Sequence, residues 1–177
     1  LLHLATHGLI NNEQPMYSKL VFSENPSDSV FDDYLHTYEL YNTKLNAKMA
    51  VLSACNTGTG EVLKGEGVIS LASGFFYAGC QSVVMSYWGV DDKITSELMK
   101  KFYANLSDGM AKDRALRKAK LQIMEEGDFF VSDPYFWAGF VVIGDASPIS
   151  SGTNYYWWIF ACLFVIACFF FYRKLRN

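Results

Sequence analysis

The sequence has no excess of basic residues: 15 Lys and Arg stand against 18 Asp and Glu, giving a formal net charge of −3. A direct nucleic-acid binder normally presents a basic face, so we expect no nucleic acid among the partners. Cysteine is scarce, and the spacing of the four cysteines fits neither a zinc site nor a disulfide framework. No Gly-rich loop follows a strand and opens a helix, as a phosphate site would require. We therefore expect neither metal nor cofactor.

Charge is missing altogether from residues 155–172. At about 1.5 Å per residue this run would span about 27 Å as a helix, close to the thickness of a bilayer core. Aromatic residues begin the run, and the basic tail 173–177 follows it. This pattern predicts a single-pass C-terminal membrane anchor, with the preceding domain on the non-cytoplasmic side. A buried core helix or an aromatic strand pair is the alternative.

Residues 1–146 alternate between short apolar runs and stretches of helical periodicity, and residues 147–154 form a polar linker to the charge-free run. Strands buried on both faces of a sheet are expected at 1–6, 49–54, 82–88 and 140–143. Helices are expected at 67–78, 93–106 and 113–125. Residues 20–22 and 34–36 are expected to form a hairpin. The alternation predicts an α/β sandwich with a mostly parallel sheet. Since the chain opens without Met inside a strand, we expect the domain to be incomplete at its N-terminus.

Two expected strands end in residues that can perform chemistry. The first leads into His7 and Gly8, and the second leads into Cys55. Active sites of open parallel sheets form at the carboxyl ends of strands, so neighbouring strands would present His7 and Cys55 at one edge. An imidazole can generate a thiolate and later protonate a leaving amine. The backbone amides of Gly8 and Cys55 could stabilise an oxyanion. His3, within the first strand, is expected to pack in the core or to support the site.

Four stretches together resemble the CHAT domain, a caspase-like module commonly found with tetratricopeptide repeats. They occur in the family's order and cover most of residues 1–144: HLATHG (3–8), VLSACNTGTG (51–60), GEGVISLASGFFYAGCQSVVMSYWGVDD (65–92) and PYFWAGFVVIG (134–144). The resemblance implies a caspase-like three-layer sandwich, tetratricopeptide repeats upstream and a His7–Cys55 dyad without an obligatory third side chain. It implies a cysteine endopeptidase acting on protein or peptide substrates.

Asp91 and Asp92 are candidates for substrate binding. Related caspase-like peptidases that cut after basic residues have an acidic residue near this segment, and a carboxylate in a pocket would pair with Arg or Lys. The two aspartates could instead cap the helix that follows. Both roles are compatible.

Two other functions remain open on the sequence. A catalytically silent, membrane-anchored scaffold could keep the fold and bind protein partners through upstream repeats. A thiol acyltransferase could use the same nucleophile and base.

Overall fold

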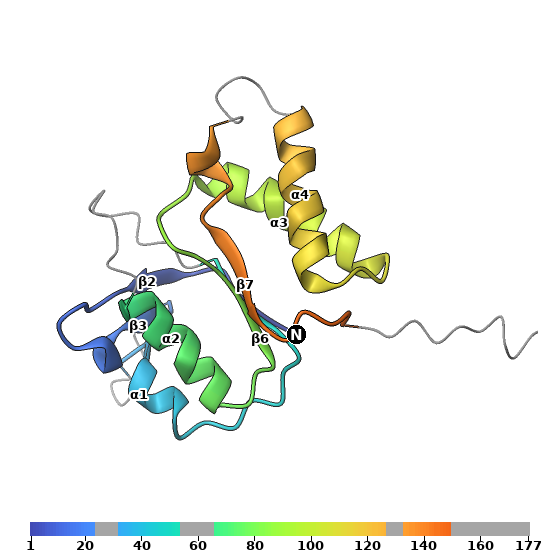
Figure 1. Cartoon of the computed structure of the whole chain (residues 1–177). Helices are drawn as coiled ribbons and strands as arrows, with labels where there is room; N and C mark the ends of the chain where they lie inside the picture. Colours follow the sequence, from blue (N-terminus) through green and yellow to red (C-terminus); the bar gives the residue numbers. More distant parts are fainter. Residues whose placement is uncertain (24–31, 54–65, 127–132, 150–177) are drawn as a thin grey trace, which may run out of the picture.

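A computed structural model of the chain describes residues 1–23, 32–53, 66–126 and 133–149 (Figure 1). Its central feature is a four-stranded sheet in the order β1-β5-β6-β7. The strands are β1 (Leu2–Leu4), β5 (Ala50–Leu52), β6 (Ser82–Ser86) and β7 (Phe140–Gly144). The first three run parallel, and β7 pairs antiparallel with β6. Every residue of β5 and β6 is buried. The expected mostly parallel sheet is confirmed.

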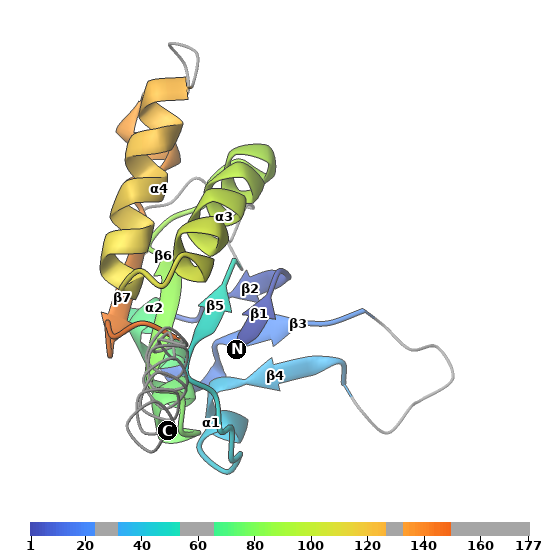
Figure 2. The same ribbon diagram turned by 90° about the vertical axis from the view of Figure 1, so that its right-hand side faces the viewer.

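Helices cover both faces of this sheet, which makes three layers (Figures 1 and 2). On one face lie α1 (Thr37–Leu40) and α2 (Glu66–Tyr77); on the other lie α3 (Asp92–Ser107) and α4 (Lys112–Glu126). Short 3-10 helices span Pro15–Tyr17 (η1) and Pro134–Phe136 (η2). The three helices expected from periodicity are α2, α3 and α4.

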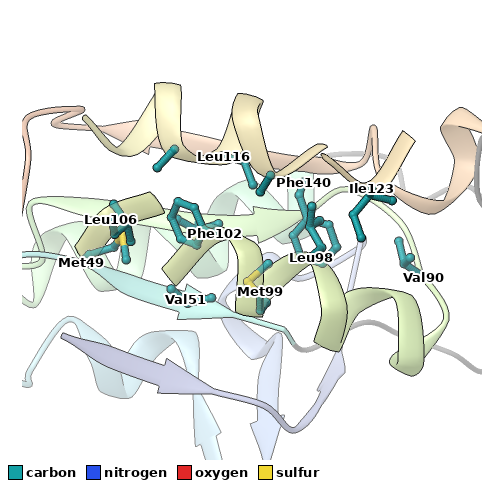
Figure 3. Close-up of a cluster of buried hydrophobic side chains, with 13 residues drawn as sticks. Met49, Val51, Val90, Leu98, Met99, Phe102, Leu106, Leu116, Ile123 and Phe140 are labelled. Carbon is teal, nitrogen blue, oxygen red and sulfur yellow. The ribbon is translucent and has the colours of Figure 1, made fainter. Parts of the chain in front are cut away.

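Alternation along the strands divides the apolar side chains between two cores. Val51 points toward α3 and α4, where Phe102 is fully buried (Figure 3). Val84 belongs to the same buried cluster. Their neighbours Leu52 and Val83 point toward α2. Strands with apolar residues on both faces therefore hold two helical layers together.

A second, smaller sheet lies beside the first (Figure 2). It contains β2 (His7–Leu9), β3 (Lys19–Val21) and β4 (Tyr34–His36), all antiparallel. The expected hairpin corresponds to β3 and β4. The expected first strand over 1–6 is shorter than predicted: it ends at Leu4, and His7 begins a strand of the second sheet.

A C-terminal transmembrane helix was part of the expected fold, and this part is wrong. Among the helices of the described residues, none is long and apolar enough to cross a membrane. The longest, α3, has 16 residues, about 24 Å of helix against a bilayer core of about 30 Å, and its outer face carries charged side chains. Residues 155–172 lie outside the described residues. A charge-free run indicates an apolar environment, but it does not distinguish a membrane from the interior of a protein. A single-pass membrane anchor is not supported by the described residues, and the non-cytoplasmic placement that depended on it is not supported either.

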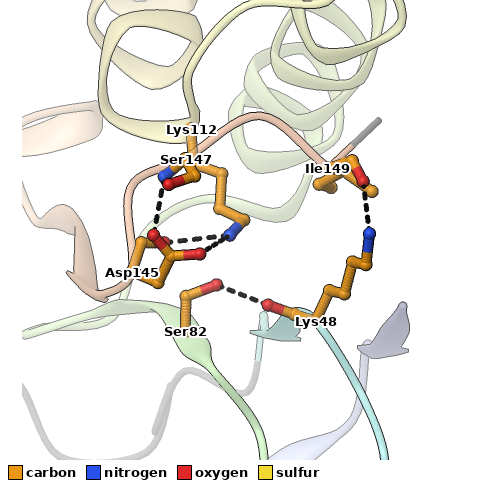
Figure 4. Close-up of polar contacts among 6 residues, drawn as sticks. All are labelled: Lys48, Ser82, Lys112, Asp145, Ser147 and Ile149. Atoms are coloured by element: carbon orange, nitrogen blue, oxygen red, sulfur yellow. Dashed lines mark hydrogen bonds and ion pairs between the residues drawn. The ribbon is translucent and has the colours of Figure 1, made fainter. Parts of the chain in front are cut away.

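Two lysine side chains hydrogen-bond to the chain that follows β7 (Figure 4). The Lys112 side chain is 1% exposed, and its Nζ donates to the backbone oxygen of Asp145 at 2.9 Å and contacts the Asp145 carboxylate at 3.3 Å. Hydrogen bonds from Ser147 and from Lys112 lower the pKa of Asp145 to about 2. Lys48 Nζ donates to the backbone oxygen of Ile149 at 3.0 Å.

Replacing the buried Lys112 tests how much its hydrogen bonds contribute to the stability of the fold. We expect Lys112→Ala to lower the free energy of unfolding by about 2 kcal/mol, because it removes hydrogen bonds from a charged, buried donor. The control is Lys100→Ala, whose ion pair with Glu97 is 67% exposed on the lysine side and should change stability by less than about 0.5 kcal/mol. Urea unfolding measures both variants. Equal losses of unfolding free energy in the two variants would contradict a stabilising role for the buried Lys112 contacts.

Candidate active site

A cleft of about 510 Å³ opens between α3 and the carboxyl ends of β1 and β5. Among its lining residues are His3, Thr6, His7, Ser53, Asp92 and Tyr103. They come from three parts of the chain that are far apart in the sequence. Parallel strand pairing is what brings the first two parts together. β1 pairs with β5, with Leu4 opposite Leu52, and the Ser53 amide donates to the Leu4 carbonyl at 3.1 Å.

The two expected strand ends are therefore neighbours, as the proposed site requires. His7 follows β1 by three residues, and Ser53 follows β5 directly. Cys55 lies two residues beyond Ser53 and outside the described residues, so its distance from His7 stays a prediction. His7 is exposed, and its imidazole makes no hydrogen bond within the part of the chain that the structure describes.

The Gly8 amide is not used by the ladder of the second sheet. Phe22 N donates to Asp33 O and Thr37 N donates to Ser18 O, which makes Leu20 a hydrogen-bonded partner of Leu35 on β4. Hydrogen-bonded pairs alternate along an antiparallel ladder. The opposite pair, Gly8 with Leu20, is therefore not hydrogen-bonded, and the Gly8 N–H points away from β3. Gly8 itself is buried and is not among the residues that line the cleft, so its contact with a substrate oxygen stays a prediction.

The two aspartates before α3 have different surroundings. The Asp91 carboxylate caps the helix: its Oδ1 accepts from Lys93 N at 2.9 Å and from Ile94 N at 3.1 Å. Asp92 is exposed, lines the cleft and makes no ion pair within the described residues. The lysine that also lines the cleft, Lys100, pairs with Glu97 instead.

Three side chains of the cleft are joined by hydrogen bonds. His3 Nε2 lies 2.9 Å from Ser53 Oγ, and His3 Nδ1 lies 2.5 Å from the Tyr103 hydroxyl. Sequence reasoning placed His3 as a packing or supporting residue and missed Tyr103. A signal was present: Thr95, Met99 and Tyr103 recur at four-residue spacing and form a stripe of α3 beside its core stripe, and this stripe borders the cleft.

Partial desolvation favours the neutral form of both rings in this cluster, although the His3 side chain remains exposed at the cleft. Desolvation lowers the pKa of His3, and desolvation raises the pKa of Tyr103 to about 12. Near neutral pH the pair is therefore an uncharged imidazole and an uncharged phenol. No group of three potential metal ligands occurs among the described residues.

The raised pKa of Tyr103 predicts that the protein loses stability at alkaline pH. Its ordinary pKa is 10.0 and its folded-state pKa is about 12, so above pH 10 the unfolded chain loses this proton while the folded chain keeps it. The unfolded state then binds fewer protons, and stability falls as pH rises from 10 toward 12. We expect the stability difference between the wild type and Tyr103→Phe to narrow over this range in urea unfolding. If the unfolding free energies of the wild type and Tyr103→Phe changed in parallel with pH, this explanation would be wrong.

These features define a class: a three-layer α/β domain with a cleft at the carboxyl ends of its parallel strands, lined by His7 and by Ser53, which precedes a cysteine by two residues in the sequence. Comparison with known families agrees with it. Residues 1–145 match the CHAT domain, and the chain belongs to the CHAT family. CHAT is a caspase-like peptidase family. The match over residues 1–145 confirms the family that the sequence motifs predicted.

Two relatives are similar over part of the chain. Both are named tetratricopeptide repeat protein 28: the mouse protein is 29% identical over 116 residues, and the human protein is 30% identical over 116 residues. Each alignment covers 66% of this chain and 5% of the relative. The chain thus matches a small portion of long proteins named for their repeats.

Proposed function

We propose that this domain is a cysteine endopeptidase that hydrolyses peptide bonds in protein substrates, with Cys55 as nucleophile and His7 as general base and acid. One observation carries the proposal. The parallel pairing of β1 with β5 puts His7 and Ser53 on one cleft, and Cys55 follows Ser53 by two residues. Membership of a caspase-like peptidase family supports the same chemistry.

The proposed reaction has two stages. His7 takes the thiol proton, and the Cys55 thiolate attacks the scissile carbonyl carbon. The oxyanion is stabilised by the Gly8 amide, which the β2–β3 ladder leaves unused, and by the Cys55 amide. His7 then protonates the leaving amine, and an acyl-enzyme remains. Water, deprotonated by His7, hydrolyses the thioester and releases the acid product.

Asp92 is the proposed determinant of substrate preference. Its carboxylate lies in the cleft without an ion pair among the described residues, so it is available to a basic side chain next to the scissile bond. Asp91 is proposed as a positioning residue here, because its carboxylate already caps α3 and fixes the helix end that carries Asp92.

The relatives suggest how substrates or partners are brought to this domain. Their name refers to tetratricopeptide repeats, and we propose that repeats elsewhere in the whole protein bind other proteins. The substrates of the whole protein would then be selected in two places, by the repeats and by the cleft.

Cleavage kinetics test the proposal. A peptide library incubated with the complete protein should be cut after Arg or Lys. Cys55→Ala and His7→Ala should each lower kcat by at least about 10³-fold, because nucleophile and base act as a unit. Asp92→Asn should lower kcat/KM for peptides with Arg before the scissile bond by about tenfold, the size of one charge-assisted hydrogen bond.

Asp108→Asn is the matched control, because Asp108 follows the opposite end of α3. It should leave kcat/KM unchanged. Wild-type rates in Cys55→Ala would refute the nucleophile assignment. No cleavage by the wild type, with partners added, would favour a catalytically silent scaffold, and transfer of the acyl group to an acceptor other than water would favour an acyltransferase.

A further inference from the structure

We propose that His3 is a positioning residue of the cleft: it hydrogen-bonds Ser53 and Tyr103 at once, and so holds the carboxyl end of β5 against α3 at the point where the chain continues to Cys55. The inference rests on the proposed function, since it assigns a second histidine to the same site. His3 itself would neither form a bond to the substrate nor transfer a proton to it.

The imidazole ring of His3 links three elements of the fold. His3 is on β1, Ser53 follows β5, and Tyr103 is on α3. The two hydrogen bonds use opposite nitrogens of the imidazole, at 2.9 Å and 2.5 Å, and the rings of His3 and Tyr103 have centroids 5.6 Å apart. Leu2 and Leu4 pack into the core on the α2 side. Alternation along β1 therefore directs His3 to the α3 side.

A neutral histidine suits this position because its ring has one donor nitrogen and one acceptor nitrogen. Each neighbouring hydroxyl can donate or accept, so either tautomer completes both hydrogen bonds. Desolvation lowers the pKa of His3 and so favours this neutral ring, although the side chain remains exposed at the cleft. An apolar side chain of similar size could fill the space but would leave Ser53 and Tyr103 without this partner.

The same three groups have the order of a nucleophile, a base and an orienting residue, and the charges decide against that role. In the Ser-His-Asp form of such a triad, the third group is an anion that stabilises the imidazolium formed during attack. Tyr103, with a pKa of about 12, is neutral and supplies no such charge. The cluster is therefore better suited to holding Ser53 in place than to activating it.

Positioning matters at this point of the chain because β5 is short. Past Leu52, the backbone hydrogen bond from Ser53 to Leu4 continues the pairing with β1. The His3 hydrogen bond adds a side-chain anchor to Ser53, two residues before the proposed nucleophile. Small misplacements of reacting groups cost large factors in rate, up to about 100-fold for about 1 Å.

The test measures Cys55 reactivity separately from peptide cleavage. The complete protein is alkylated with iodoacetamide at pH 7, and the rate at Cys55 is followed by mass spectrometry. We expect His3→Ala to slow this alkylation and to lower kcat by about 10- to 100-fold, with KM changed by less than about threefold. His3→Gln keeps a donor and an acceptor and should recover most of the loss.

Controls separate positioning from folding. His36→Gln changes a histidine of the second sheet, which lies near Asp32 and outside the cleft, and should leave both rates unchanged. Thermal unfolding is measured for each variant. If alkylation and kcat fall only in proportion to lost folded protein, with no recovery in His3→Gln, the role is merely structural and the inference is overturned.

The two proposals fail in different ways. A wild type that cleaves peptides, with a His3→Ala variant that matches it in kcat and alkylation rate, would overturn the inference and leave the peptidase standing. A wild type that does not cleave, with slowed Cys55 alkylation in His3→Ala restored in His3→Gln, would reject the peptidase and support the positioning role. Unchanged alkylation without any cleavage would reject both.

Discussion

The pairing of β1 with β5 is the constraint on which the rest of the site depends. Three registered residue pairs, from Leu2 with Ala50 to Leu4 with Leu52, place two distant segments side by side and pointing the same way. In a parallel pair the carboxyl ends meet at the same edge. His7 and Ser53 consequently share a cleft, which neither segment could form alone.

The two cores give this pairing its rigidity. β5 is buried on both faces: Val51 contacts the α3–α4 layer, while Ala50 and Leu52 contact the α2 layer. A shift of one residue would exchange these faces and put each side chain into the wrong core. α3 is fixed by the same packing, through Leu98 and Phe102; Met99 belongs to this core and also borders the cleft, together with the partly buried Tyr103. Stability and site geometry thus come from adjacent faces of one helix.

Local pattern predicts part of this structure and long-range contact determines the rest. The buried runs around Val51 and Val84 and the periodic stripe of α3 are visible in the sequence, because burial on a face repeats with the period of the element. The end of β1 at Leu4 was not predicted, since no turn residue marks the change into β2. The hydrogen bond between His3 and Tyr103 joins residues 100 positions apart, and no local pattern contains that information. The uncharged run at 155–172 led to a wrong prediction because hydropathy alone does not specify the surroundings.

The central claim is that His7 activates Cys55 for attack on a peptide carbonyl. The most direct measurement treats the complete protein with a peptidyl acyloxymethyl ketone carrying Arg at its reactive end, and locates the adduct by mass spectrometry. The account predicts a thioether on Cys55 that forms in the wild type and is lost in His7→Ala. An adduct that forms equally fast without the imidazole, or that forms on another residue, would contradict it.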